Sequence, residues 1–175
     1  AFSLPDRRKM SLGALYFCLG IQLSVYDYAM RKDLEKYNVS MSMISVWMFG
    51  IYFPWFAKFV PALASDYFGV NGYHRKPYMI IGNCVAAVCM LIISNEQMSA
   101  PSYIGFFFLY NLAICLADVN YDACIVKATR EEDKDSGERG SLQSFMIISR
   151  EVGNAIGDCM GPLLWKEFGS SGVYQ

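Results

Sequence analysis

The amino-acid sequence predicts an all-α integral membrane protein, and three observations lead to this fold class. Hydrophobic residues make up 54% of the 175 residues and charged residues only 18%, against about 25% charged residues in an average soluble domain. The charges gather in short islands, "DRRK" (6–9), "RKDLEK" (31–36), "YHRKPY" (73–78) and "KATREEDKDSGER" (127–139). Between the islands the chain is nearly free of charge for about 15 to 20 residues at a time, the length of a membrane-spanning helix.

These uncharged stretches predict five transmembrane helices. Length without charge, rather than periodicity, is the signal. The predicted helices cover residues 11–30, 41–65, 78–94, 103–128 and 141–165. The last contains several charged side chains, which a sheltered and partly polar environment would explain. The chain begins at Ala1 and continues after the last helix as "KEFGSSGVYQ", which reads as the start of an interrupted sixth span. We therefore expect a truncated architecture.

Basic residues between the predicted helices indicate the orientation in the membrane, because cytoplasmic loops carry an excess of Lys and Arg. One side of the membrane carries nine basic residues and the other carries four. The richer side, which we expect to face the cytoplasm or the equivalent compartment of an organelle, carries Arg7, Arg8, Lys9, Arg75, Lys76, Lys127, Arg130, Lys134 and Arg139. The sequence thus predicts an integral protein of the plasma membrane or of a plastid or mitochondrial membrane.

Several functional classes are excluded by composition. A net charge of −1 gives no basic field that would attract a nucleic acid. All six cysteines fall in apolar segments without the C-x-x-C spacing of a metal or redox site. No nucleophile–base set, phosphate loop or metal cluster is visible. The sequence therefore predicts neither an enzyme nor a cofactor or metal site.

Charged residues inside the predicted helices are the strongest functional signal. At about 1.5 Å of rise per residue, five of them, on three helices, lie roughly 9 to 15 Å from the ends of their helices that face the same side of the membrane. A charge at mid-membrane costs at least about 2.5 kcal/mol, so such a residue is by default a candidate for a functional site. The predicted substrate- or proton-binding layer consists of Lys58, Asp118, Asp122, Arg150 and Glu151.

Within this layer, Asp118 and Asp122 are four residues apart on one helix face, where like charges repel. The pair should attract a cation, either Lys58 or Arg150, or one carboxyl should hold a transported proton. The alternative is that the charges only neutralise one another and join the helices. Both readings stay open at the level of the sequence.

Small residues recur along the last predicted helix in "GNAIGDCMGP". Gly153, Gly157 and Gly161 are spaced by four and form a groove that allows another helix to approach closely. Pro162 adds a kink. The sequence predicts a helix-packing surface here, with a hinge as the second reading.

The turn that follows the second predicted helix resembles the conserved loop of the major facilitator superfamily. In that loop a small residue is followed by an acid, a glycine and a basic cluster, here Ala62, Asp66, Gly72 and His74-Arg75-Lys76. The glycine run of the last helix is similar to the superfamily's G-x-x-x-G-P element.

The chain more closely resembles the folate–biopterin transporter family of that superfamily, over about residues 12–165. Pro54, Trp55 and Lys58 match a family Pro-Trp-x-x-Lys segment, and "GYHRKPY" (72–78) matches Gly-Tyr-Arg-Arg-Lys-Pro-Tyr. "ADVNYD" (117–122), "ERGSLQS" and "SREVGNAIG" are similar to further family segments. His74 in place of arginine, Ala62 in place of glycine and Lys127 in place of an acid depart from the pattern.

The resemblance implies that residues 1–175 are an incomplete amino-terminal transmembrane half-domain of a secondary transporter. Its partners would be the lipid bilayer, a pterin- or folate-like organic anion or a proton, and the missing second transporter half or other subunits of a membrane complex. Asp66, Gly72, Arg75 and Lys76 would form a conformational latch. The alternative function is a transport-incompetent structural subunit of a respiratory, ATP-synthase or photosynthetic complex.

Overall fold

The structure is a computed structural model of the chain, and it describes residues 6–38, 40–69, 73–94, 98–136 and 140–174. The described residues form α-helices and no strand, which confirms the predicted all-α class. The helices are α1 (Asp6–Glu35), α2 (Met41–Phe56), α3 (Phe59–Tyr67), α4 (Lys76–Ile93), α5 (Ala100–Ser136) and α6 (Ser141–Tyr174). Each of the five predicted helical segments coincides with one or two of these helices, apart from residues 57–58, between α2 and α3, and residue 94, just after α4.

The chain divides into two compact units, which are described separately. The first unit contains residues 1–31 and 123–169, and the second contains residues 32–122 and 170–175. The first unit is therefore built from most of α1, the second part of α5 and most of α6. The second unit is built from α2, α3, α4 and the first part of α5.

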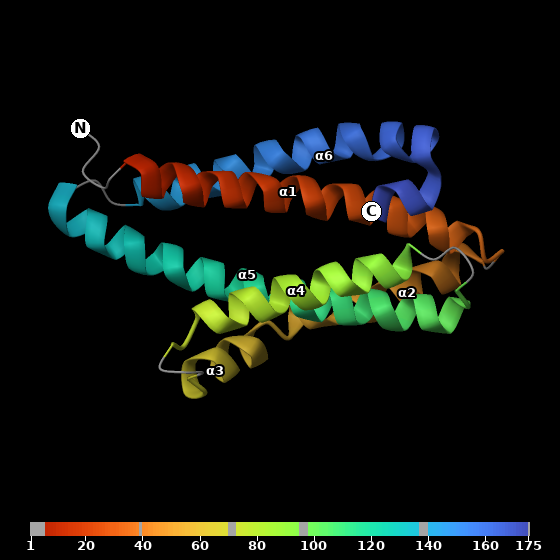
Figure 1. Ribbon diagram of the computed structural model, residues 1–175, viewed down its shortest axis with the longest axis horizontal. Helices are drawn as coiled ribbons and strands as arrows, with labels where there is room; N and C mark the ends of the chain where they lie inside the picture. The colour runs from red at the N-terminus through yellow and green to blue at the C-terminus, as the bar shows by residue number, and fades with distance from the viewer. Residues whose placement is uncertain (1–5, 39, 70–72, 95–97, 137–139, 175) are drawn as a thin grey trace. The chain divides into compact units, whose positions relative to one another are not determined.

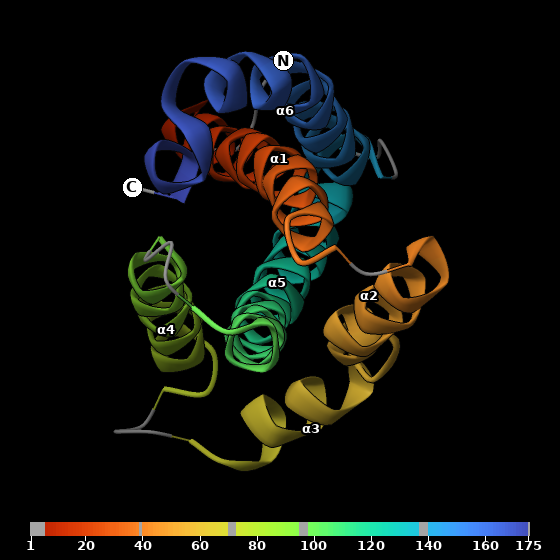
Figure 2. The same ribbon diagram turned by 90° about the vertical axis from the view of Figure 1, so that its right-hand side faces the viewer.

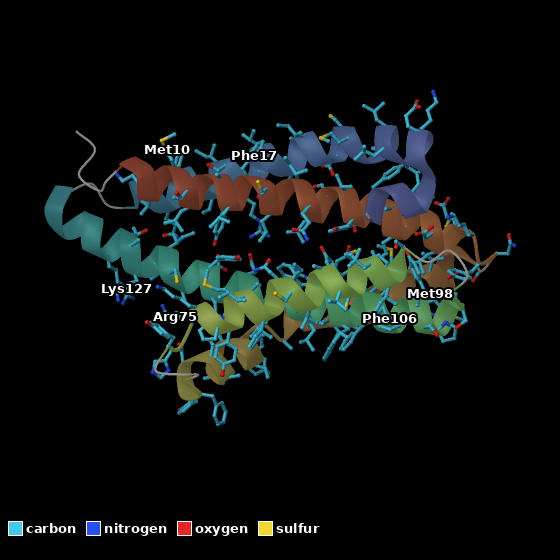
Figure 3. The ribbon with its side chains drawn as sticks, in the orientation of Figure 1. Met10, Phe17, Arg75, Met98, Phe106 and Lys127 are labelled. Atoms are coloured by element: carbon cyan, nitrogen blue, oxygen red, sulfur yellow. The ribbon has the colours of Figure 1, made fainter. Side chains whose placement is uncertain are left out.

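In the first unit, α1 and α6 run side by side (Figures 1 and 2), and glycines lie at their contact. A Cβ atom on Gly153 would lie 2.2 Å from the carbonyl oxygen of Phe17, a residue of α1 that Figure 3 labels. A Cβ on Gly157 would lie 2.7 Å from the Ile21 carbonyl oxygen, and one on Gly20 would lie 2.3 Å from that of Arg150. The two backbones thus approach so closely that no side chain fits between them at these positions.

In the second unit, α4 approaches α5 through Gly82, whose Cβ would lie 2.6 Å from the Ala113 carbonyl oxygen. At the opposite end of α5, the Tyr103 hydroxyl donates a hydrogen bond of 3.0 Å to Asp33, and the Tyr37 hydroxyl donates one of 3.1 Å to the Met98 carbonyl. Burial and the nearby charge of Asp33 raise the pKa of Tyr37 above its ordinary value. These contacts join the end of α1 and the residues that follow it to the start of α5 and the residue segment just before it.

The helix predicted over residues 41–65 is not continuous, which corrects the expectation of one uninterrupted helix. The structure ends α2 at Phe56 and begins α3 at Phe59, and α3 leaves the line of α2 (Figure 2). The break has a local cause in Pro61, which lacks the N–H that would donate to the Ala57 carbonyl and whose ring would collide with it. The Ala57 carbonyl instead accepts from the Val60 N–H, at 2.9 Å.

Restoring the missing donor should close this break. In Pro61→Ala, the new N–H can donate to the Ala57 carbonyl, so we expect α2 and α3 to join and hydrogen exchange of the amides of residues 58–61 to slow. Hydrogen–deuterium exchange measured by mass spectrometry checks this result. Pro101→Ala is the matched control, because Pro101 lies in the first turn of α5, where a helical N–H has no partner. Unchanged exchange in Pro61→Ala would show that another feature breaks the helix.

Length and hydropathy distinguish the helices that could span a membrane among the described residues. Three helical segments are long and apolar enough to cross a membrane, Met41–Tyr67, Lys76–Ile93 and Ala100–Arg130. The first of these includes the break between α2 and α3. The predicted spans 11–30 and 141–165 form helices, and their crossing of the membrane stays a prediction.

Candidate substrate site at the helix break

The candidate site lies in the second unit, where a polar face of α5 meets the break between α2 and α3. The polar face consists of Asn111, Cys115, Asp118 and Asp122, spaced by four, three and four residues. This spacing places all four side chains on one side of the helix, because residues three and four apart are neighbours on a helix surface. Each of them contacts a residue of the segment Pro54 to Lys58.

Lys58 lies at the break and forms the central contact of the site. Its Nζ atom donates to Asp118 Oδ2 at 2.5 Å and lies 3.6 Å from Asp122 Oδ2. The Lys58 side chain is 34% exposed, that of Asp118 is fully buried, and that of Asp122 is 50% exposed. The ammonium therefore connects a buried carboxylate to one that is accessible.

The electrostatics of the trio follow from its surroundings. A lone charge in an apolar region is expensive, and removing one partner of a buried ion pair costs about 3 to 5 kcal/mol because the other charge stays behind. Asp118 therefore holds Lys58 in place more strongly than Asp122 does, since the Lys58–Asp118 contact is shorter and more buried. The trio has two negative charges for one positive charge when all three groups are ionised.

Two further contacts fix the segment before Lys58, and both involve α5 residues that were not predicted from the sequence as site residues. The Trp55 indole Nε1 donates to Asn111 Oδ1 at 2.8 Å, and the Cys115 thiol donates to the Pro54 carbonyl at 3.3 Å. The Lys58 Nζ atom lies 4.9 Å from the centre of the Trp55 ring. Asn111 and Cys115 precede Asp118 by seven and three residues, a spacing that places all three on one face of a helix. This spacing is the sequence pattern that could have identified them as site residues.

The other two residues of the predicted charge layer lie in the first unit, on α6. Arg150 is partly exposed, and its backbone carbonyl lies against Gly20 of α1. Glu151 is exposed and accepts a hydrogen bond of 3.2 Å from Asn154. The structure thus brings Lys58, Asp118 and Asp122 together, and one layer of five charges stays a prediction.

The predicted latch lies between α3 and α4. The Arg75 guanidinium is 3.5 Å from the Asp66 carboxylate; the Arg75 side chain is partly exposed and that of Asp66 is exposed. Arg75 lies at the start of α4 (Figure 3), and the Lys76 ammonium lies 5.6 Å from the centre of the Tyr73 ring. The Tyr78 hydroxyl closes the turn by donating to the Phe68 carbonyl at 2.7 Å. Gly72 lies outside the described residues, and the latch role stays a prediction.

Comparison with known proteins identifies the family of the chain. The model of the BT1 family matches residues 20–175. The chain belongs to the BT1 family. Three described helical segments are long and apolar enough to cross a membrane, and this finding in a BT1 chain confirms the predicted membrane location. No solved structure matches the chain.

The relatives of this BT1 chain carry transporter names. It is 30% identical to "Probable folate-biopterin transporter 5" of Arabidopsis thaliana, over 85% of the chain and 29% of the relative. It is 28% identical to "Probable folate-biopterin transporter 2" of the same plant, over 82% of the chain and 28% of the relative. It is 26% identical to "Folate transporter 1" of Plasmodium falciparum (isolate 3D7), over 70% of the chain and 24% of the relative. The chain thus spans less than a third of the length of these relatives.

Proposed function

We propose that this BT1 chain is part of a secondary transporter that moves a pterin- or folate-like compound, or another small organic anion, across a membrane. The observation that carries the proposal is the Lys58–Asp118 ion pair at a helix break, with a second carboxylate, Asp122, 3.6 Å from the same ammonium. Family membership and the names of the relatives support the substrate class.

The chemistry of the trio suits reversible anion binding. In the empty site Asp118 neutralises Lys58, so the ammonium is not left alone in an apolar region. An anionic group of the substrate can take the place of Asp118 on Lys58, and a proton on the released carboxyl then removes its charge. Asp122 is half exposed, so its carboxylate can take up a proton from solution and pass it to Asp118, or accept a hydrogen bond from a ring N–H of a pterin.

The broken helix adds to this function. Discontinuous helices in transporters expose backbone groups at mid-membrane, where they serve substrate and ion sites. Transport in such folds proceeds by rocking of one repeat against another around the site. In this proposal Arg150 and Glu151 of α6 also bind the substrate or a proton, and Asp66, Arg75 and Lys76 stabilise one of the transporter's states.

Uptake by vesicles that contain the complete gene product tests this function. Labelled folate, biopterin and other organic anions are offered to wild type, Lys58→Ala and Arg150→Ala. We expect wild type to accumulate at least one of these anions and both variants to lose most of that uptake. Uptake that is unaffected in Arg150→Ala would remove Arg150 from the site. A wild type that takes up none of them would favour the structural-subunit function instead.

A further inference from the structure

The indole ring of Trp55 has a partner at its N–H edge and another over its aromatic face. Its Nε1 donates to Asn111 Oδ1 at 2.8 Å, and the Lys58 ammonium lies 4.9 Å from the centre of its ring. An indole N–H is a donor only, so in an apolar surrounding it needs an acceptor. Asn111 supplies that acceptor and thereby sets the direction of the ring.

Asn111 is itself held in one orientation. It is 4% exposed, and its Nδ2 donates to the Phe107 carbonyl at 3.0 Å. A flip of the amide would aim its NH2 at the Trp55 N–H and its oxygen at the Phe107 carbonyl, which would lose both hydrogen bonds. The backbone of α5 thus fixes Asn111, and Asn111 fixes Trp55.

The ring face of Trp55 then limits where the Lys58 ammonium can lie. A cation within about 6 Å of an indole centre is attracted to the ring, and the attraction is stronger where water is excluded. The same ammonium is 2.5 Å from Asp118 and 3.6 Å from Asp122. The ring therefore favours a position of Lys58 that keeps Asp118 as the close partner.

We propose that Trp55 and Asn111 are positioning residues that hold the Lys58 ammonium between the indole ring and Asp118, ready for an anionic substrate. This inference rests on the proposed function, since it gives a reason for the ammonium to be held at that place. When the pair is broken, Lys58 can move toward the more exposed Asp122, where water weakens its attraction for an anion. The effect should appear in substrate affinity and not in the maximal rate.

The functional test is a double-mutant cycle on uptake by the complete gene product, with Trp55→Phe, Asn111→Leu and the double variant. Loss of a hydrogen bond worth about 1 kcal/mol, together with a weaker ring–cation contact, predicts a KM raised about 5- to 20-fold in each single variant. Maximal rates should stay within about twofold, and the double variant should resemble the single variants because both lose the same bond. Trp47→Phe, the same exchange two turns earlier on α2, should leave KM unchanged.

A second measurement does not depend on transport. Fluorine NMR of the complete gene product labelled with 5-fluorotryptophan reports on the Trp55 ring, whose signal is assigned by its absence in Trp55→Phe. We expect Lys58→Met and Asn111→Leu each to shift this signal, and neither to shift the signal of Trp47.

The outcomes separate the two proposals. Three results would each overturn the positioning role. One is a Trp55 signal that does not move in Lys58→Met. The others are a wild-type KM in the single variants and fully additive effects on KM in the double variant. A wild type without uptake, but with a Trp55 signal that responds to Lys58→Met and to Asn111→Leu, would retain the positioning of Lys58 and reject the transport function.

Discussion

Replacement of Asp118 by leucine is expected to destabilise the protein and abolish its uptake. Asp118 is fully buried and lies 2.5 Å from Lys58, so the variant leaves the ammonium without its buried partner. The loss of one member of a fully buried ion pair costs about 3 to 5 kcal/mol, and we expect a smaller cost here because Lys58 is 34% exposed and keeps Asp122 at 3.6 Å. Thermal unfolding in detergent, followed by size-exclusion chromatography, should show a much lower transition temperature than that of wild type.

The double variant Lys58→Met/Asp118→Leu separates stability from function. It removes both charges, so we expect the transition temperature to recover most of the loss while uptake stays absent. Glu35→Leu is the control, because Glu35 pairs with Lys32 at an exposed position where ion pairs contribute about 0 to 1 kcal/mol. Stability of Asp118→Leu equal to wild type would contradict the structural account of the trio.

A second large effect is expected at the contact between α1 and α6. In Gly153→Ala the new methyl group would lie 2.2 Å from the Phe17 carbonyl oxygen, so the two helices must separate. Overpacking of a tight contact costs about 1 to 3 kcal/mol, and occasionally more. We expect a lower transition temperature in the same unfolding assay and a reduced yield of monodisperse protein.

Gly105 of α5 provides the matched control for this substitution. No heavy atom lies within 4 Å of a Cβ placed there, so Gly105→Ala should be neutral or should stabilise the helix by about 0.5 to 1 kcal/mol. Equal transition temperatures for Gly153→Ala and Gly105→Ala would mean that α1 and α6 do not pack through these glycines.

The helices and the charged trio were accessible from the sequence for simple physical reasons. A stretch without charge has to match the thickness of a bilayer, so length alone locates the segments that form α4 and α5. A charge inside such a stretch needs a partner, so Lys58 and the α5 carboxylates stood out together. Depth along the helix was enough to suggest that they meet.

The break between α2 and α3 and the role of Trp55 were not accessible in the same way. Pro54 and Pro61 can both disturb a helix. The sequence alone does not decide which of the two prolines interrupts it, and so does not place the break at Ala57 and Lys58. The hydrogen bond between Trp55 and Asn111 depends on the rotation of α5 about its own axis relative to α2. That rotation is determined by packing and is absent from any local pattern.

The binding affinity of the purified complete gene product for labelled biopterin and folate tests the central role of Lys58 most directly. Equilibrium binding is compared between wild type, Lys58→Met and Lys127→Met, since Lys127 is an exposed lysine of α5. A hydrogen bond to a charged group is worth about 1.5 to 3 kcal/mol, so we predict that Kd rises about 10- to 150-fold in Lys58→Met and is unchanged in Lys127→Met. Binding by Lys58→Met as tight as that by wild type would contradict the proposal that this ammonium holds the anion.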